Sequence, residues 1–158
     1  MKKMLLMFYF VLSYSMLVFP LTSFAPNAPA ITFIETAQPI RLSDQYESLA
    51  KAVFHWETRG SMDTLSYNQK ENACGPFQIR PCRLEHYNSL TGKNYTLQDM
   101  YDFNKAKEVF LYFATHDNRG RLVLNKPFEL VAKNWNGSGP MTEGYWAGVR
   151  DVLYKFYS

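Results

Sequence analysis

The feature that most constrains this chain is a helical stripe of apolar residues that ends directly at a carboxylate. Leu49, Ala52, Val53 and Trp56 recur at the spacing of one helix face, and Glu57 follows at once. We therefore expect a helix on which the stripe is buried and Glu57 lies at its border. Partial desolvation at such a border raises the pKa of a carboxyl group, so that it holds a proton near neutral pH. Glu57 is a candidate general acid.

Prolines, glycines and capping residues mark further helices. Ser43 with Asp44 is an N-cap signal for the helix that carries Glu57, and Gly60 is its stop. The later expected elements are Pro81 to Gly92, a short turn from Thr96 to Tyr101, Phe103 to His116, Pro127 to Asn136, and a last helix from Thr142. We expect five or six helices in all.

One segment interrupts the helical pattern. Residues 61–72 are mostly polar and carry no helical apolar stripe, so we expect a small irregular or β excursion there. No other stretch reads as a run of strands, and the predicted fold class is mainly α. A length of 158 residues with 47% apolar composition is enough for one small domain with its own core.

The N-terminal segment has the pattern of an export signal. Lys2 and Lys3 precede an uncharged apolar run from Met4 to Phe19, and the small residues Ser23 and Ala25 follow. Residues 1–25 are predicted to be a signal peptide or an uncleaved N-terminal anchor. Residues 26–42, with several prolines, are predicted to be an extended linker, and 43–158 the folded domain. The protein is expected to be exported, either periplasmic, associated with the cell envelope, or secreted.

The charge pattern limits the classes of partner. The net charge is +3, and no run of Lys and Arg occurs beyond Lys2-Lys3, which argues against strong nucleic-acid binding. A mildly basic surface suits an anionic cell-wall polymer. Aromatic residues make up 16% of the chain, and rings with a polar handle serve as platforms for sugars as well as in cores.

The two cysteines flank one glycine-marked turn. Cys74 and Cys82 border the segment from Gly75 to Pro81. In an exported chain such a pair predicts either a disulfide that clamps the turn or two buried thiols. A catalytic thiol is disfavoured, because neither cysteine has a histidine base in a recognisable local motif.

The pattern of histidines argues against a metal site. His55 and Glu57 are two residues apart on a helix and do not share a face. The chain has no HExxH and no CxxC spacing. We expect neither a metal nor a cofactor.

Three segments together resemble a known family. They are Glu57-Thr58, the run Gly75-Pro76-Phe77-Gln78-Ile79-Arg80-Pro81, and the run Asn134-Trp135-Asn136-Gly137-Ser138-Gly139. In order and spacing they are similar to soluble-lytic-transglycosylase-type, lysozyme-like domains, whose motifs are Glu-Ser, G-L-M-Q-I-x-P and A-Y-N-A-G-x-G. The resemblance covers roughly residues 45–154. Thr58, Pro76 and Trp135 depart from the motifs.

The resemblance implies a fold and a reaction. The fold would be lysozyme-like, α+β, with the polar excursion beside a cleft. The activity would be that of a peptidoglycan lytic transglycosylase, which cleaves the β-1,4 bond between MurNAc and GlcNAc and leaves 1,6-anhydroMurNAc ends. Glu57 would act as acid and then as base on the sugar's 6-hydroxyl, assisted by the substrate's N-acetyl group. The partners would be glycan strands, and some such enzymes serve an envelope-spanning secretion or conjugation machine.

Five further residues are candidates for substrate binding, namely Ser66, Gln78, Trp135, Asn136 and Tyr145. Gln78 sits in the turn of the second motif, where backbone and amide donors would meet a sugar's acetamido group. Trp135 and Asn136 stand where the third motif has Tyr and Asn. The alternatives are a solvated loop for Ser66, a surface side chain for Gln78, and core packing for Trp135 and Tyr145.

Two other functions stay open. A goose-type lysozyme would hydrolyse the same bond, with a second carboxylate such as Asp63 or Glu71 to orient water. A non-catalytic relative would bind peptidoglycan or assist assembly without turnover. Glu57 is the only carboxylate that a motif marks, which favours the transglycosylase.

Overall fold

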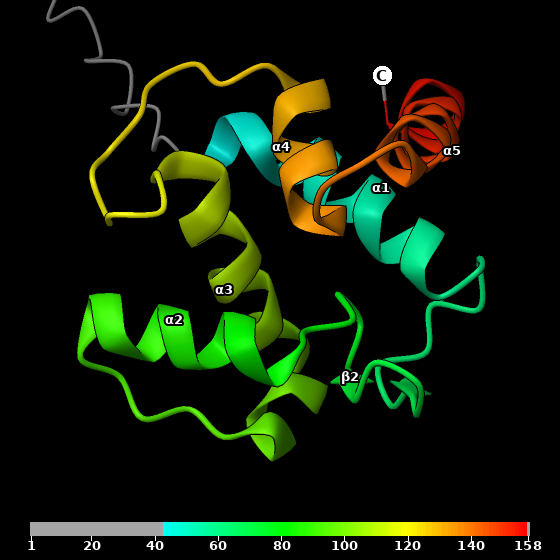
Figure 1. Cartoon of the computed structure of the whole chain (residues 1–158). Coiled ribbons are helices and arrows are strands. Elements are labelled where there is room, and N and C mark those ends of the chain that lie inside the picture. The colour runs from blue at the N-terminus through cyan, green and yellow to red at the C-terminus, as the bar shows by residue number, and fades with distance from the viewer. Residues whose placement is uncertain (1–42, 158) are drawn as a thin grey trace, which may run out of the picture. The chain divides into compact units, whose positions relative to one another are not determined.

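The computed structural model describes residues 43–157, and this part of the chain is mainly helical (Figure 1). Its elements are the 3₁₀ helix η1 (Asp44–Tyr46), α1 (Glu47–Glu57), β1 (Tyr67–Asn68), β2 (Ala73–Cys74), α2 (Pro81–Thr91), the 3₁₀ helix η2 (Leu97–Tyr101), α3 (Phe103–Thr115), α4 (Phe128–Asn136) and α5 (Met141–Phe156). The predicted mainly α class is confirmed, and the polar excursion contains a two-stranded sheet.

The N-terminal predictions fall outside this part of the chain. The signal or anchor segment 1–25 and the linker 26–42 lie outside the described residues. Among residues 43–157, no helix is long and apolar enough to cross a membrane.

Local signals fix most helix ends. Pro81 is the first residue of α2, and Gly92 closes that helix in the left-handed region at φ 72°. The Asp102 carboxylate caps α3, where it accepts the backbone N–H groups of Asn104 and Lys105. The start of α1 differs from the prediction, because the Ser43 side chain makes no cap and the chain enters α1 through η1.

The helices enclose an aromatic core into which the second motif inserts. Helix α5 packs against α1 and α4, and α3 packs against α1, α2 and α4 (Figure 1). Phe77, in the turn after β2, is fully buried and stacks on Phe110 of α3 with 5.3 Å between ring centroids. Trp135 of α4 packs edge-on against the Phe110 ring, with 5.0 Å between ring centroids. The core therefore anchors the turn that leads to α2.

The apolar stripe of α1 is buried except at its last member. Leu49, Ala52 and Val53 have no exposed surface, as the periodicity predicts. Trp56 is 40% exposed, so the prediction that it belongs to the buried stripe is wrong. It lies in the final turn of α1, where the helix leaves the core and reaches the borders of two surface hollows.

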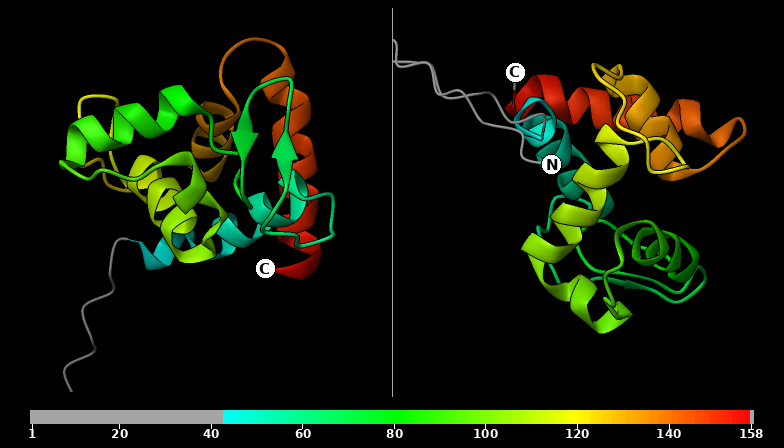
Figure 2. Two further views of the ribbon diagram at one scale, coloured as in Figure 1. Left: turned by 90° about the horizontal axis from the view of Figure 1, so that it is seen from below. Right: turned by 90° about the vertical axis from the view of Figure 1, so that its left-hand side faces the viewer.

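A small hairpin and a tight turn follow α1. Strands β1 and β2 pair antiparallel, and Figure 2 shows them side by side. Cys74 then pairs with Ile79, which closes the turn that begins at Gly75. Gly75 has φ 78°, and a Cβ there would lie 1.8 Å from the carbonyl oxygen of Met100 in η2. Glycine is needed for this close approach of two backbones.

The cysteines fit neither predicted alternative. Both are free thiols, with Cys74 buried and Cys82 exposed. The Cys74 thiol donates to the carbonyl oxygen of Leu97 at 3.3 Å, which directs the side chain towards η2, whereas Cys82 lies on the outer surface of α2. Two backbone hydrogen bonds between Cys74 and Ile79, of 3.1 and 2.9 Å, close the turn in place of a disulfide.

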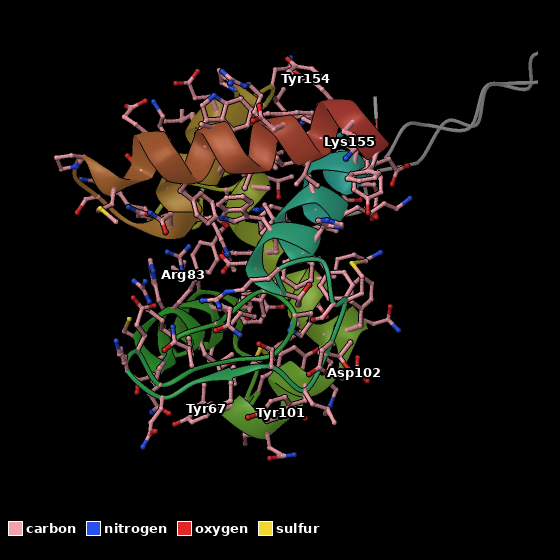
Figure 3. All side chains as sticks on the ribbon, turned by 90° about the vertical axis from the view of Figure 1, so that its right-hand side faces the viewer. Tyr67, Arg83, Tyr101, Asp102, Tyr154 and Lys155 are labelled. Atoms are coloured by element: carbon pink, nitrogen blue, oxygen red, sulfur yellow. The ribbon has the colours of Figure 1, made fainter. Side chains whose placement is uncertain are left out.

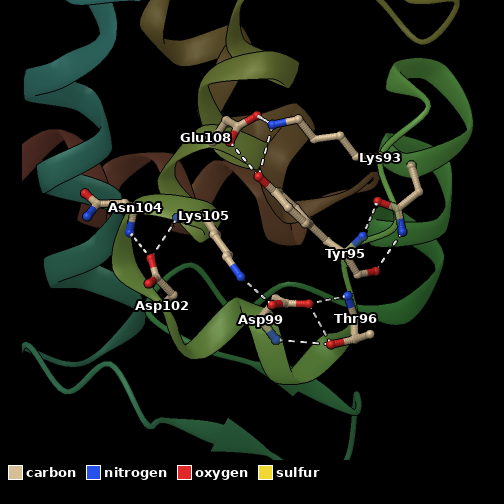
Figure 4. A network of polar contacts seen from close by, with 9 residues as sticks. Lys93, Tyr95, Thr96, Asp99, Asp102, Asn104, Lys105 and Glu108 are labelled. Carbon is tan, nitrogen blue, oxygen red and sulfur yellow. Dashed lines mark hydrogen bonds and ion pairs between the residues drawn. The ribbon is translucent and has the colours of Figure 1, made fainter.

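A polar network fastens the segment between α2 and α3 (Figure 4). Glu108 of α3 pairs with Lys93 and accepts the hydroxyl of Tyr95 at 2.9 Å. Asp99 accepts the Thr96 hydroxyl at 2.7 Å and pairs with Lys105 at 2.5 Å, which joins η2 to the first turn of α3. These bonds hold η2, against which Gly75 packs.

Candidate functional site

Three adjoining hollows surround the C-terminal end of α1. The largest, of about 1150 Å³, lies between the last turn of α1, the β1 strand with the loop after it, and Gln78. Another, of about 750 Å³, lies between Trp56, the end of α4 and the start of α5. A narrow hollow of about 90 Å³ shares Glu57 with the first and Asn136 with the second. We call these three hollows the cleft.

Glu57 borders the cleft, and its carboxyl group is a weaker acid than usual. Burial of the carboxyl group raises its pKa from the usual 4.5 to about 7. The hydroxyl of Tyr145 and the positive charges of Arg80 and Arg83 act in the opposite direction, because they favour the carboxylate. Near neutral pH the group is therefore protonated in a large fraction of molecules, as a general acid requires.

Tyr145 reaches Glu57 from the other end of the fold. Its hydroxyl, on α5, donates to Oε1 of Glu57 at 2.7 Å. Burial and the nearby carboxyl group raise the pKa of Tyr145 well above 10, so the hydroxyl keeps its proton. The predicted alternatives for Tyr145 coexist, since its ring is buried while its hydroxyl contacts the candidate acid.

Gln78 and Ser66 lie together on the border of the largest hollow. The Gln78 amide nitrogen donates to the Ser66 hydroxyl at 3.1 Å and to the carbonyl oxygen of Gly75 at 3.0 Å. These bonds use the amide donors that we expected to meet a sugar. The carboxamide oxygen of Gln78 is the atom left for a ligand.

The third motif divides between core and cleft. Trp135 is buried, and its indole N–H donates to the carbonyl oxygen of Phe77 at 3.1 Å. This bond joins α4 to the turn of the second motif, so Trp135 acts mainly in the core and touches only the narrow hollow of the cleft. Asn136, the last residue of α4, borders two of the three hollows.

Thr58, which replaces the motif serine, has a structural role. Its hydroxyl donates to the carbonyl oxygen of Phe54 at 2.8 Å and accepts the backbone N–H of Met62 at 3.1 Å. These bonds fix the chain immediately after Glu57.

The two candidate second carboxylates have different surroundings. Glu71 borders the cleft and forms an ion pair of 2.7 Å with Arg80. Asp63 is exposed, accepts the backbone N–H of Leu65 at 2.8 Å, and borders none of the three hollows.

Two arginines of the cleft, Arg80 and Arg83, were missing from the sequence-based candidates. Arg83, on α2, donates to the carbonyl oxygens of Asn134 and Trp135 at 3.2 and 2.9 Å, and its guanidinium lies 4.4 Å from the Trp135 ring centroid. Figure 3 shows its side chain rising from α2. It thereby satisfies carbonyl groups at the end of α4, next to Asn136. Both arginines lie within or one turn after the second motif, which was the available signal.

No metal site is formed within residues 43–157, where no three His, Cys, Asp or Glu side chains are grouped closely enough. His55 instead packs against the Phe156 ring, with 5.1 Å between centroids.

Comparison with known proteins gives no match. No family model, no curated protein and no solved structure matches this chain.

Proposed function

We propose that this protein is a peptidoglycan lytic transglycosylase with a lysozyme-like α+β fold, and that it cleaves the β-1,4 bond between MurNAc and GlcNAc. One observation carries the proposal. Glu57 is a carboxyl group with a pKa near 7 at the border of a cleft, and the segments that resemble the second and third motifs border the same cleft. An acidic group with this pKa suits proton transfer in both directions.

In the proposed reaction, neutral Glu57 protonates the glycosidic oxygen as the bond to the anomeric carbon breaks. The substrate's N-acetyl oxygen attacks that carbon and stabilises the positive charge. Glu57, now a carboxylate, takes the proton of the 6-hydroxyl, whose oxygen displaces the N-acetyl oxygen and closes the 1,6-anhydro ring. Tyr145, Arg80 and Arg83 favour the carboxylate form between the two steps.

A hydrolase is the second candidate, and Glu71 favours it. Glu71 borders the same narrow hollow as Glu57, together with the amide groups of Asn68, Gln78 and Asn136. A carboxylate there would orient a water molecule, as in inverting glycosidases. Its contact with Arg80 is the argument against this role, because the Arg80 guanidinium donates two hydrogen bonds, of 3.0 and 2.7 Å, to Oε2 of Glu71 and so occupies that oxygen.

The test is the mass of the product released from purified peptidoglycan. We expect anhydro ends, which lack the water that hydrolysis adds, and we expect Glu57→Gln to lower the rate at least about a hundredfold with the fold intact. Asp63→Asn is the matched control, since Asp63 borders none of the three hollows. A Glu57→Gln variant that keeps most of its rate would remove the proposal. Hydrated ends, together with equal losses in Glu71→Gln, would establish the hydrolase.

The proposed substrate sets the proposed location. Peptidoglycan lies outside the cytoplasmic membrane, which agrees with the export signal expected in residues 1–25. We propose a periplasmic, envelope-associated or secreted protein that acts on glycan strands, alone or beside an envelope-spanning secretion or conjugation machine, without a cofactor or nucleic acid.

A further inference from the structure

Trp56 is an exposed aromatic side chain on an otherwise buried helix face. It keeps 40% of its surface exposed, whereas Leu49, Ala52 and Val53 on the same stripe keep none. What distinguishes this ring is its place at the rim of two hollows, because aromatic side chains are common in the lining of concave binding sites.

The exposed ring is held in a fixed position. The outer edge of its indole lies against α5 at Gly148, where a Cβ would come within 2.1 to 2.4 Å of Cη2, Cζ3 and Cζ2. On another side the ring meets Tyr145 at right angles, with 6.5 Å between centroids. Residue 148 must be glycine for this seat to exist, and Tyr145 is the same residue that hydrogen-bonds Glu57.

The position places the ring at the candidate bond-cleavage point. Trp56 borders both large hollows of the cleft, and Glu57 is its neighbour in the chain. Among the described residues Trp56 is the one that lines both large hollows, so a polymer that occupies both would lie next to the indole.

We propose that Trp56 is the platform on which one pyranose ring of the glycan rests beside Glu57. The axial C–H groups of a hexose form an apolar face that suits an indole, while its hydroxyl groups remain free for polar neighbours. Asn136 and the carboxamide oxygen of Gln78 are such neighbours in the same cleft. The identity of the glycan rests on the proposed function, whereas the role of the ring does not depend on turnover.

The test measures binding separately from cleavage. In the Glu57→Gln background, we expect Trp56→Ala to weaken binding of tetra-N-acetylglucosamine, measured by titration calorimetry, by about tenfold or more, and Trp56→Phe to weaken it less. Phe156→Ala is the matched control, because Phe156 is 52% exposed and borders none of the three hollows. It should bind as the parent does.

A second pair of variants tests the seat itself. Where Trp56 is present, Gly148→Ala should displace the indole and weaken binding. In the Trp56→Ala background, the same substitution should lower neither the affinity nor the melting temperature. This double-mutant cycle shows whether the ring lies on α5, even if one single variant folds poorly.

The outcomes separate the inference from the proposed function. Unchanged affinity in Trp56→Ala, or no binding of tetra-N-acetylglucosamine and of sedimented peptidoglycan by the Glu57→Gln protein, overturns the platform. Ring-dependent binding without any cleavage by the parent supports the platform and overturns the transglycosylase. Anhydro products from the parent, together with unchanged affinity in Trp56→Ala, support the transglycosylase and overturn the platform.

Discussion

The acidity of Glu57 is set by a small group of side chains. Burial favours the neutral acid, whereas the 2.7 Å hydrogen bond from Tyr145 and the charges of Arg80 and Arg83 favour the carboxylate. The balance puts the pKa at about 7. The contributions of Tyr145, Arg80 and Arg83 can each be removed by one substitution, and removal of the Tyr145 hydroxyl is the smallest of these changes.

Tyr145→Phe removes that hydroxyl and leaves the ring. We expect the pKa of Glu57 to rise further, because a hydrogen bond to the carboxylate is lost, and the alkaline limb of the pH–rate profile to move to higher pH. The rate at neutral pH should fall about tenfold, because Glu57 also loses its fixed orientation. Tyr154→Phe, on the same helix but 65% exposed, is the control. A profile unchanged in Tyr145→Phe would contradict a role for this bond in setting the acidity.

Among the elements, the turn after β2 connects the most parts of the site. It carries Gln78 to the cleft, inserts Phe77 into the core, and approaches η2 so closely that Gly75 has no room for a side chain. Its backbone bonds with Cys74 and Ser66 make it continuous with the hairpin.

Gly75→Ala should therefore destabilise the protein by at least about 2 kcal/mol, since it combines a positive φ with a backbone clash. Gly92→Ala is a matched control, because Gly92 has φ 72° but no atom within 4 Å of an added Cβ. It should cost only the backbone strain, about 1 kcal/mol. Chemical denaturation curves measure both, and equal losses at the two positions would show that the contact with η2 contributes nothing.

For the whole molecule, the acidity of Glu57 has a cost in stability. An acid whose pKa is higher in the folded state binds its proton more tightly there, so the free energy of unfolding is greatest below the unfolded-state pKa and falls as pH rises. For Glu57 the fall runs from about pH 4.5 to about pH 7. A shift of this size corresponds to at most about 3 kcal/mol.

Glu57→Gln removes this titration and should be more stable than the parent at pH 8, with a smaller difference at pH 4. The difference in melting temperature between variant and parent isolates Glu57 from other groups that titrate. One such group is the Asp117 carboxyl, because its hydrogen bonds with Arg121 lower its pKa to about 2. Melting temperatures measured across this range test the prediction. A difference that stays constant with pH would show that the carboxyl group is not buried as described.

The local sequence was sufficient to predict the helices and most of their ends, the start of α1 excepted. Pro81, Gly92 and the Phe103 to His116 stripe each act through backbone geometry or through residues one or two turns away, and the structure places α2 and α3 accordingly. Glu57 was found for the same reason, because it directly follows an apolar stripe whose first members are buried.

Only the tertiary structure decided which side chains meet in the cleft. Tyr145 reaches Glu57 across 88 residues of sequence, and Trp56 is open because Gly148 of α5 receives only the edge of its ring. Both contacts depend on how α1 packs against α5, and no periodicity within either helix contains that information. Tertiary packing also separates the two cysteines, because the Cys74 side chain is buried against η2 whereas Cys82 is exposed on α2. Local sequence sets the elements because it fixes backbone preferences, whereas packing between distant elements sets the site.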